Sequence, residues 1–227
     1  MAPSYVSRNG ALSLACLALV ALAGGCADLM RTVPEAQRLH AQSEYERGVT
    51  LFRESQLSAA LPALQQAVTL DPQVSAYHNA LGVLYLSLRR PDLALEPFKR
   101  AVALDASYAE AQLNVGIALA EAGRWEEAVT AYQKAIALPT LFSPQTAHQN
   151  LGLALYHLKR YAEAERALDF AISLDPRMEG AYYNLGLVLI AEDRKADATL
   201  AFRKVGELAP NSPFGQAAVE RLKDLGR

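Results

Sequence analysis

The feature that most constrains this sequence is a repeat of about 34 residues. Five glycines stand at separations of 34, 34, 36 and 34 residues, namely Gly48, Gly82, Gly116, Gly152 and Gly186. In every copy an alanine follows the glycine by twelve residues, and a leucine follows that alanine by ten. A fixed period near 34 is typical of solenoids, in which each repeat is a pair of helices packed on the next pair. We therefore predict an all-α fold and expect binding in place of catalysis.

Apolar spacing within one period predicts two helices. Leu81, Leu84 and Leu88 recur every three or four residues, as the buried stripe of a helix requires. The stretch 89–92 interrupts this pattern, and Pro91 suits the first position of a second helix. Glycine inside a helix costs about 0.5–1 kcal/mol relative to alanine, so five glycines in register imply a shared packing reason. We expect that reason to be a close approach of the two helix backbones.

These residues resemble the tetratricopeptide repeat family, which places small residues at its eighth, twentieth and twenty-seventh positions. The resemblance implies an all-α tetratricopeptide-repeat solenoid of five helix pairs plus a C-terminal capping helix. The five repeats would occupy residues 41–74, 75–108, 109–142, 145–178 and 179–212.

Two segments depart from the regular repeat. Residues 213–227 place apolar side chains on one helical face, at Phe214, Ala218, Leu222 and Leu225. This pattern predicts a helix that caps the last repeat, which a solenoid needs for solubility. The segment 139–144 adds two residues before the fourth repeat. We expect it to alter the packing angle there, through either sequence drift or a functional role.

Residues 1–25 have the pattern of a bacterial lipoprotein signal peptide. They contain one charged residue, Arg8, and an apolar run at 11–22 that is shorter than the roughly 20 residues needed to span a bilayer. The run ends in Leu22-Ala23-Gly24-Gly25-Cys26, which resembles a lipobox. That resemblance implies cleavage after residue 25 and acylation of Cys26, for example with palmitate. An uncleaved anchor and an ordinary secretory cut remain alternatives.

The residues after the predicted cleavage point indicate where the protein is held. Residues 26–40 would comprise the lipidated cysteine, a short tether and the start of the first helix, because Pro34 can open a helix. Ala27 follows Cys26 where an aspartate would signal retention at the inner membrane. By resemblance to the sorting rule of such lipoproteins, we expect an anchor in the outer membrane, at its periplasmic face.

Composition argues against several classes of function. Removal of residues 1–25 takes away one basic residue, which leaves 21 basic and 24 acidic residues and a net charge of −3. That sign is wrong for a nucleic-acid binder. No glycine-rich phosphate loop is present, and the histidines do not approach metal-ligand spacing; they are His40, His78, His148 and His157. We expect no cofactor, metal, small-molecule substrate or enzymatic activity.

The binding surface is expected on the first helix of each pair. In tetratricopeptide repeats these helices line a concave face, and the sixth, ninth and twelfth positions are among those that point into it. The candidate groove residues at these positions are Val83, Leu86, Asn114, Ile117, Asn150, Leu153, Tyr156, Asn184, Leu187 and Ile190. Large apolar groups on a water-facing surface indicate an interaction site, although burial between neighbouring first helices is the alternative.

The polar groups of the predicted groove narrow the kind of partner. Asparagine amides both donate and accept hydrogen bonds, so they could pair with a bound peptide or with another helix. The neighbouring groove positions hold no lysine or arginine, which disfavours capture of a terminal carboxylate. We expect an apolar segment of a protein partner.

The chain also resembles the type IV pilus biogenesis lipoproteins of the PilF/PilW type, the pilotins of the pilus secretin. The resemblance is clearest at residues 138–152, where an extended junction precedes Asn150-Leu151-Gly152. It implies a scaffold that escorts secretin subunits to the outer membrane and promotes their multimerisation. Two alternatives are an envelope adaptor that recruits peptidoglycan-modifying or outer-membrane assembly proteins, and a scaffold whose groove is filled by a second copy of itself.

Overall fold

The computed structural model describes residues 33–226, which form eleven α-helices and no strand. The predictions for the signal segment 1–25 and for Cys26 lie outside this range. Ten helices form five consecutive pairs: α2 (Glu35–Arg53) with α3 (Leu57–Leu70), α4 (Ser75–Ser87) with α5 (Pro91–Leu104), α6 (Ala109–Glu121) with α7 (Trp125–Ile136), α8 (Pro144–His157) with α9 (Tyr161–Leu174), and α10 (Glu179–Ala191) with α11 (Lys195–Leu208). A further helix, α12 (Pro213–Asp224), follows the last pair. The predicted fold class is confirmed.

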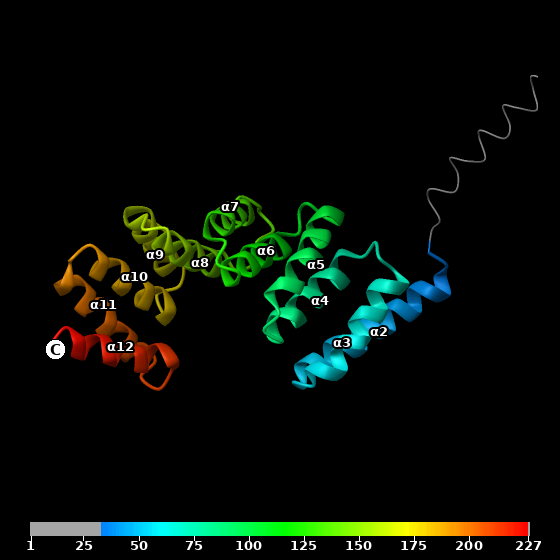
Figure 1. Cartoon of the computed structure of the whole chain (residues 1–227), viewed down its shortest axis with the longest axis horizontal. Coiled ribbons are helices and arrows are strands. Elements are labelled where there is room, and N and C mark those ends of the chain that lie inside the picture. The colour runs from blue at the N-terminus through cyan, green and yellow to red at the C-terminus, as the bar shows by residue number, and fades with distance from the viewer. Residues whose placement is uncertain (1–32, 227) are drawn as a thin grey trace, which may run out of the picture.

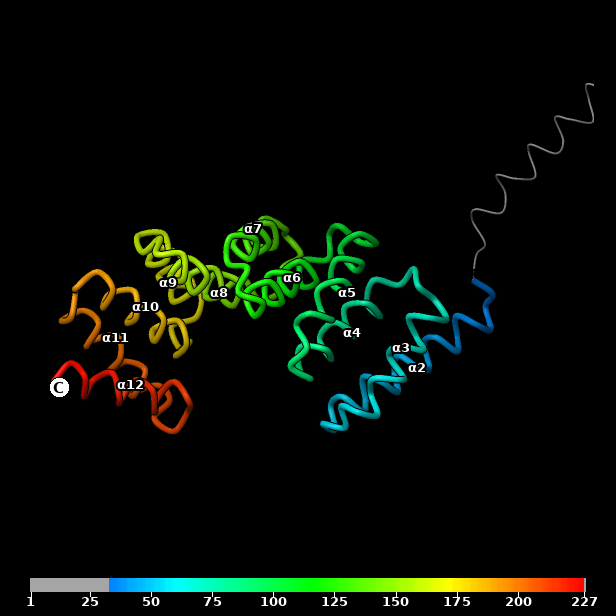
Figure 2. The backbone as a smooth tube through the Cα atoms, in the orientation of Figure 1, coloured from blue at the N-terminus to red at the C-terminus, as the bar shows by residue number. Residues whose placement is uncertain are grey.

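The helix pairs stack into an arch with an inner and an outer layer (Figure 1). We call α2, α4, α6, α8 and α10 the A helices, and α3, α5, α7, α9 and α11 the B helices. Each A helix contacts its own B helix and the next A helix along the stack. Within residues 33–226, no B helix contacts the next B helix. Each of the first four B helices also packs on the A helix of the next pair, and this is the main contact between consecutive pairs. The A helices form the inner layer, while the B helices, such as α7 and α9, spread along the outer side; the backbone trace shows the same curvature (Figure 2).

The repeat glycines make room for a side chain of the paired B helix. A Cβ atom would lie 2.5 Å from the Phe98 ring at Gly82 and 2.6 Å from the Phe202 ring at Gly186. At Gly116 it would overlap the ring of Tyr132, and at Gly48 and Gly152 it would meet a leucine side chain. A backbone atom of the facing helix also lies 3.2 Å from the Cβ position at Gly48 and at Gly152, so the expected close approach of backbones is confirmed at these two glycines only. The space left by the missing Cβ is filled by the large residue of the facing helix.

The last helix, α12, packs against α10 and α11 at the end of the arch. The hydroxyl oxygen of Ser212 accepts a hydrogen bond from the Gly215 N–H at 3.0 Å, which caps the start of the helix. The Phe214 ring lies 5.5 Å from the Tyr183 ring of α10, and Ala218 is fully buried. The apolar face of the last pair is thus covered. Among the described helices, none has the length and hydropathy of a membrane-spanning segment.

Candidate peptide-binding groove

All ten predicted groove residues lie on A helices. The structure places Val83 and Leu86 in α4, Asn114 and Ile117 in α6, Asn150, Leu153 and Tyr156 in α8, and Asn184, Leu187 and Ile190 in α10. Nine of these side chains are half-buried, whereas Asn184 is only 4% exposed. Exposure in the groove and burial between neighbouring A helices, the two alternatives for the apolar positions, therefore each hold in part. Each of these side chains contributes to the packing and leaves some surface accessible.

Three of the predicted residues meet at an open cavity of about 370 Å³ between α6 and α8. Ile117 of α6 and Asn150 and Leu153 of α8 line it. Four other residues complete the lining, namely Ala120, Glu121, Trp125 and Tyr132. Glu121 occupies the thirteenth repeat position, which also faces the groove in this kind of repeat, so its position could have identified it. Trp125 and Tyr132 come from α7, and no groove pattern in the sequence points to them.

An aromatic cluster fixes one wall of this cavity. The Trp125 ring stacks on the His157 ring, with centroids 3.9 Å apart and an interplanar angle of 8°. The Tyr156 ring meets His157 edge-on, at 5.6 Å and 72°. Tyr156 therefore packs on the His157 ring that joins the fourth repeat to Trp125 of the third. The stacking holds the indole of Trp125 in a defined orientation beside Ile117 and Leu153.

The asparagines of the groove do not share one role. The Asn114 amide donates a hydrogen bond to the Asn79 side-chain oxygen at 2.9 Å, and the Asn79 amide donates to the Tyr108 hydroxyl at 3.1 Å. This chain of bonds joins α4 to the start of α6, so Asn114 serves helix packing. Asn150, by contrast, lines the α6–α8 cavity. It is the asparagine best placed to meet a ligand.

Charge in the cavity comes from one carboxylate. Burial is the main cause that raises the pKa of the Tyr132 hydroxyl, and the nearby negative charge of Glu121 adds to it. Glu121 itself is exposed at the last residue of α6. The cavity is thus an apolar and aromatic hollow with an acid at its rim and an amide on its wall.

The junction before α8 is fastened to the start of α6. The Thr140 hydroxyl donates to the Ser107 carbonyl at 2.5 Å, and the Phe142 N–H donates to a Glu110 carboxylate oxygen at 2.7 Å. Leu141 packs against the core, whereas Phe142 is 89% exposed. The two extra residues therefore form an anchored loop that presents an aromatic side chain to solvent.

Two histidines, His78 of α4 and His148 of α8, occupy packing positions. The His78 ring lies 2.9 Å from the Pro72 carbonyl oxygen, through Nε2. His148 lies 4.4 Å from the Phe170 ring, and its buried Nδ1 has no hydrogen-bond partner. Burial lowers the pKa of His148, which favours the neutral ring. No group of three potential metal ligands occurs within residues 33–226.

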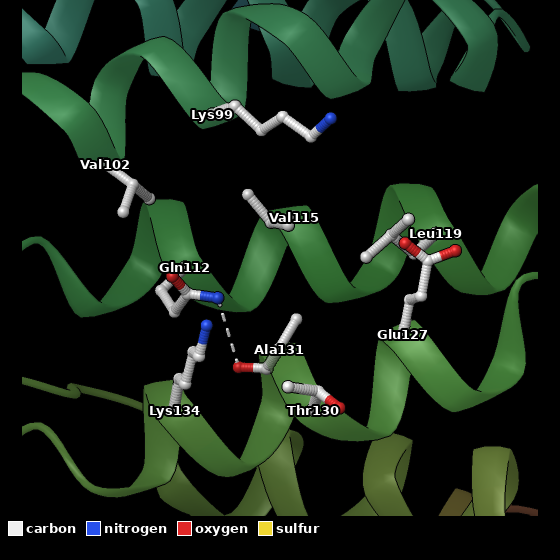
Figure 3. A pocket seen from close by; sticks show the side chains of 9 residues that line it. All are labelled: Lys99, Val102, Gln112, Val115, Leu119, Glu127, Thr130, Ala131 and Lys134. Carbon is white, nitrogen blue, oxygen red and sulfur yellow. Dashed lines mark hydrogen bonds between the residues drawn. The ribbon is translucent and has the colours of Figure 1, made fainter.

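A second cavity, of about 330 Å³, lies between α5, α6 and α7 (Figure 3). α6 forms its floor through Gln112, Val115 and Leu119, and α5 and α7 form its walls. Its charges are already paired in part, since Lys99 binds Glu96 at 3.0 Å and Glu127 binds Arg124 at 2.6 Å. None of the predicted groove residues lines this cavity. It is the seam that remains where neighbouring B helices stand apart.

Stacked helix pairs with a continuous inner face define a solenoid of the kind that serves as a protein-interaction scaffold. The family model of the tetratricopeptide repeat matches residues 45–109, 98–143, 116–169 and 150–213, and the chain belongs to this family. No curated protein sequence matches the chain.

Several solved structures share this architecture. PilF of Pseudomonas aeruginosa is similar with a TM-score of 0.69 and 22% identity, over 84% of this chain and 89% of that one. MamA is similar with a TM-score of 0.66 and 26% identity, over 75% of this chain and 92% of that one. PilW, described as a widely conserved type IV pilus biogenesis factor, is similar with a TM-score of 0.68 and 20% identity, over 81% of this chain and 92% of that one. The chain therefore resembles pilus biogenesis factors in fold.

Proposed function

We propose that this protein is a non-catalytic, lipid-anchored scaffold that holds a segment of a secretin subunit in its groove and assists pilus secretin assembly at the outer membrane. The fold shared with PilF and PilW supports this proposal, as does the lipobox-like sequence that ends at Cys26. The acylated cysteine would address the protein to the membrane. The groove would shield an apolar segment of the partner until the partner assembles.

The observation that carries the proposal is the α6–α8 cavity. Ile117 and Leu153, which the repeat pattern assigns to the groove, line an open hollow of about 370 Å³ together with Asn150. An apolar hollow with a few polar groups is the usual form of a recognition pocket. Apolar side chains of a partner would enter it, and the Asn150 amide would pair with the partner's backbone.

Charge introduced on the groove wall tests this function. Leu153→Asp combined with Leu187→Asp should weaken binding of the full-length chain to purified secretin subunits of the same organism by more than about tenfold, because two apolar contacts would become desolvated carboxylates. Calorimetry would measure the affinity. The control is Leu200→Asp on the outer helix α11, where the leucine is 64% exposed, and it should bind as the unaltered chain does.

The outcomes separate the proposal from its main alternative. Equal affinity of the groove variant and the control would overturn the groove as the binding site. If the unaltered chain bound a peptidoglycan hydrolase through the same groove and did not bind secretin subunits, the result would support an envelope adaptor and contradict the pilotin proposal.

A further inference from the structure

The A helices of the second to fifth repeats carry permanent charge of one sign only. Helices α4, α6, α8 and α10 contain no lysine or arginine and three glutamates, Glu110, Glu121 and Glu179. Glu110 is engaged by the Phe142 N–H of the inter-repeat junction. Of the three, Glu121 is the one that lines the α6–α8 cavity. A partner in this groove therefore meets an apolar surface with an unbalanced negative charge.

Glu121 stands where a helix disfavours an acid. The C-terminal end of a helix carries a partial negative charge, so cations are stabilising there and carboxylates are not. The other A helices end in Arg53, Ser87, His157 and Ala191. Two of them are followed by an acid at the C-cap, but Glu54 accepts a hydrogen bond from Gln56 and Glu192 accepts one from Arg194. None of the ion pairs within the described part of the chain involves Glu121. Its carboxylate thus lies at the negative end of the helix dipole and forms no salt bridge with a cation of residues 33–226.

The rest of the cavity suits the stem of a long cationic side chain. Ile117, Ala120 and Leu153 supply an aliphatic surface, and the indole of Trp125, held by its stack on His157, supplies an aromatic wall. Arginine combines a methylene stem that lies on apolar surface with a planar guanidinium that stacks on aromatic rings and binds carboxylates through two hydrogen bonds. Lysine offers neither the plane nor the paired donors.

We propose that the α6–α8 cavity receives an arginine side chain of the bound segment, whose guanidinium pairs with Glu121 while its stem lies on Ile117 and Leu153. This inference rests on the proposed function in so far as the partner occupies the groove. It adds the chemistry of the partner, which is an apolar segment with one arginine at the level of the third and fourth repeats.

A peptide selection tests this proposal even before the natural partner is identified. Random dodecapeptides displayed on phage would be selected on the full-length chain. The Leu153→Asn, Leu187→Asn variant, which removes apolar contact without adding a carboxylate that could itself pair with arginine, would identify those bound in the groove. Groove-dependent peptides should be enriched in arginine at one position. Replacement of that arginine by citrulline, which keeps the shape and removes the charge, should weaken binding about tenfold.

The matching change in the protein completes a double-mutant cycle. Glu121→Gln should lower the affinity for the arginine peptide by the same factor of about ten. It should leave the affinity for the citrulline peptide unchanged, because that peptide has no guanidinium to pair with Glu121. Glu207→Gln removes an equal charge from the outer helix α11 and should change neither affinity. Circular dichroism would verify that each variant keeps its helical content.

The results distinguish two kinds of failure. If no selected peptide depends on the groove residues, the proposed function is wrong and the arginine pairing falls with it. If groove-dependent peptides lack arginine, or if Glu121→Gln binds them as the unaltered chain does, only the arginine pairing is wrong.

Discussion

At the scale of single residues, the repeat is built on a pair of positions. Each repeat glycine is followed sixteen residues later by a large side chain, at Leu64, Phe98, Tyr132, Leu168 and Phe202. In the structure that side chain fills the space above its glycine. The regular spacing along the sequence identifies the glycines that belong to the repeat. It does not reveal which side chain covers each glycine, since that depends on how the B helix is rotated against the A helix.

Substitution of one glycine tests this pairing. Gly116→Ala should lower the free energy of unfolding by about 1–3 kcal/mol, because the added methyl group would overlap the buried Tyr132 ring. Urea denaturation followed by circular dichroism measures the change.

A second helical glycine supplies the matched control. Gly206 of α11 has no neighbouring atom near the position of a Cβ, so Gly206→Ala should raise the free energy of unfolding by about 0.5–1 kcal/mol through helix propensity alone. Equal effects of the two substitutions would show that the Tyr132 ring does not require a glycine beneath it.

The groove residues show a limit of the same kind. The repeat position identifies Ile117 and Leu153 as facing the inner side, and the structure places both in one cavity. Asn114 stands at the same repeat position as Asn150, yet it bonds to Asn79 of the neighbouring helix. A register position fixes the direction of a side chain. Its partner depends on which polar group the next repeat brings within reach.

At the scale of elements, helices follow the apolar pattern closely, and the connections are less predictable. The two extra residues before α8 are visible in the sequence as a longer interval. The hydrogen bond from the Phe142 N–H to Glu110 joins residues 32 positions apart and leaves no local pattern. It gives the junction a fixed attachment to α6.

Removal of α12 tests its role as a cap. A chain that ends at Ser212 should lose about 2–4 kcal/mol of unfolding free energy and should self-associate, because the faces of α10 and α11 that pack on Phe214 and Ala218 would be exposed. Denaturation and light scattering measure the two effects. Val219→Ser, at a side chain in α12 that is 45% exposed, should change neither. A monomeric truncated chain of unaltered stability would show that the last pair needs no cover.

At the scale of the whole molecule, the stacking predicted by the 34-residue period produces an arch. The period specifies the number of pairs and their order. The cavity between α6 and α8 arises from the distance between neighbouring A helices and from the Trp125 ring supplied by α7. These depend on three-dimensional packing, so the cavity could not be located from the period alone.

The proposed membrane attachment is tested at Cys26. Cys26→Ser should abolish incorporation of labelled palmitate into the full-length chain, because the acylated thiol would be gone. Cys16→Ser alters a cysteine inside the predicted signal segment and should leave labelling of the mature protein intact. Label retained in the Cys26→Ser chain would place the lipid elsewhere and would remove the basis for an outer-membrane anchor.

The two layers of the arch differ in how they are joined, and this bears on its mechanics. Every contact between consecutive pairs involves an A helix, while the described B helices stand apart from one another. Consecutive pairs are joined mainly where a B helix packs on the following A helix, and no contact between neighbouring B helices fixes the spacing of the outer layer. A small rotation of one pair about this contact therefore changes the spacing of the outer helices most. A partner held along the inner face would therefore lose few of its contacts when the arch bends, because such a bend changes mainly the spacing of the outer helices.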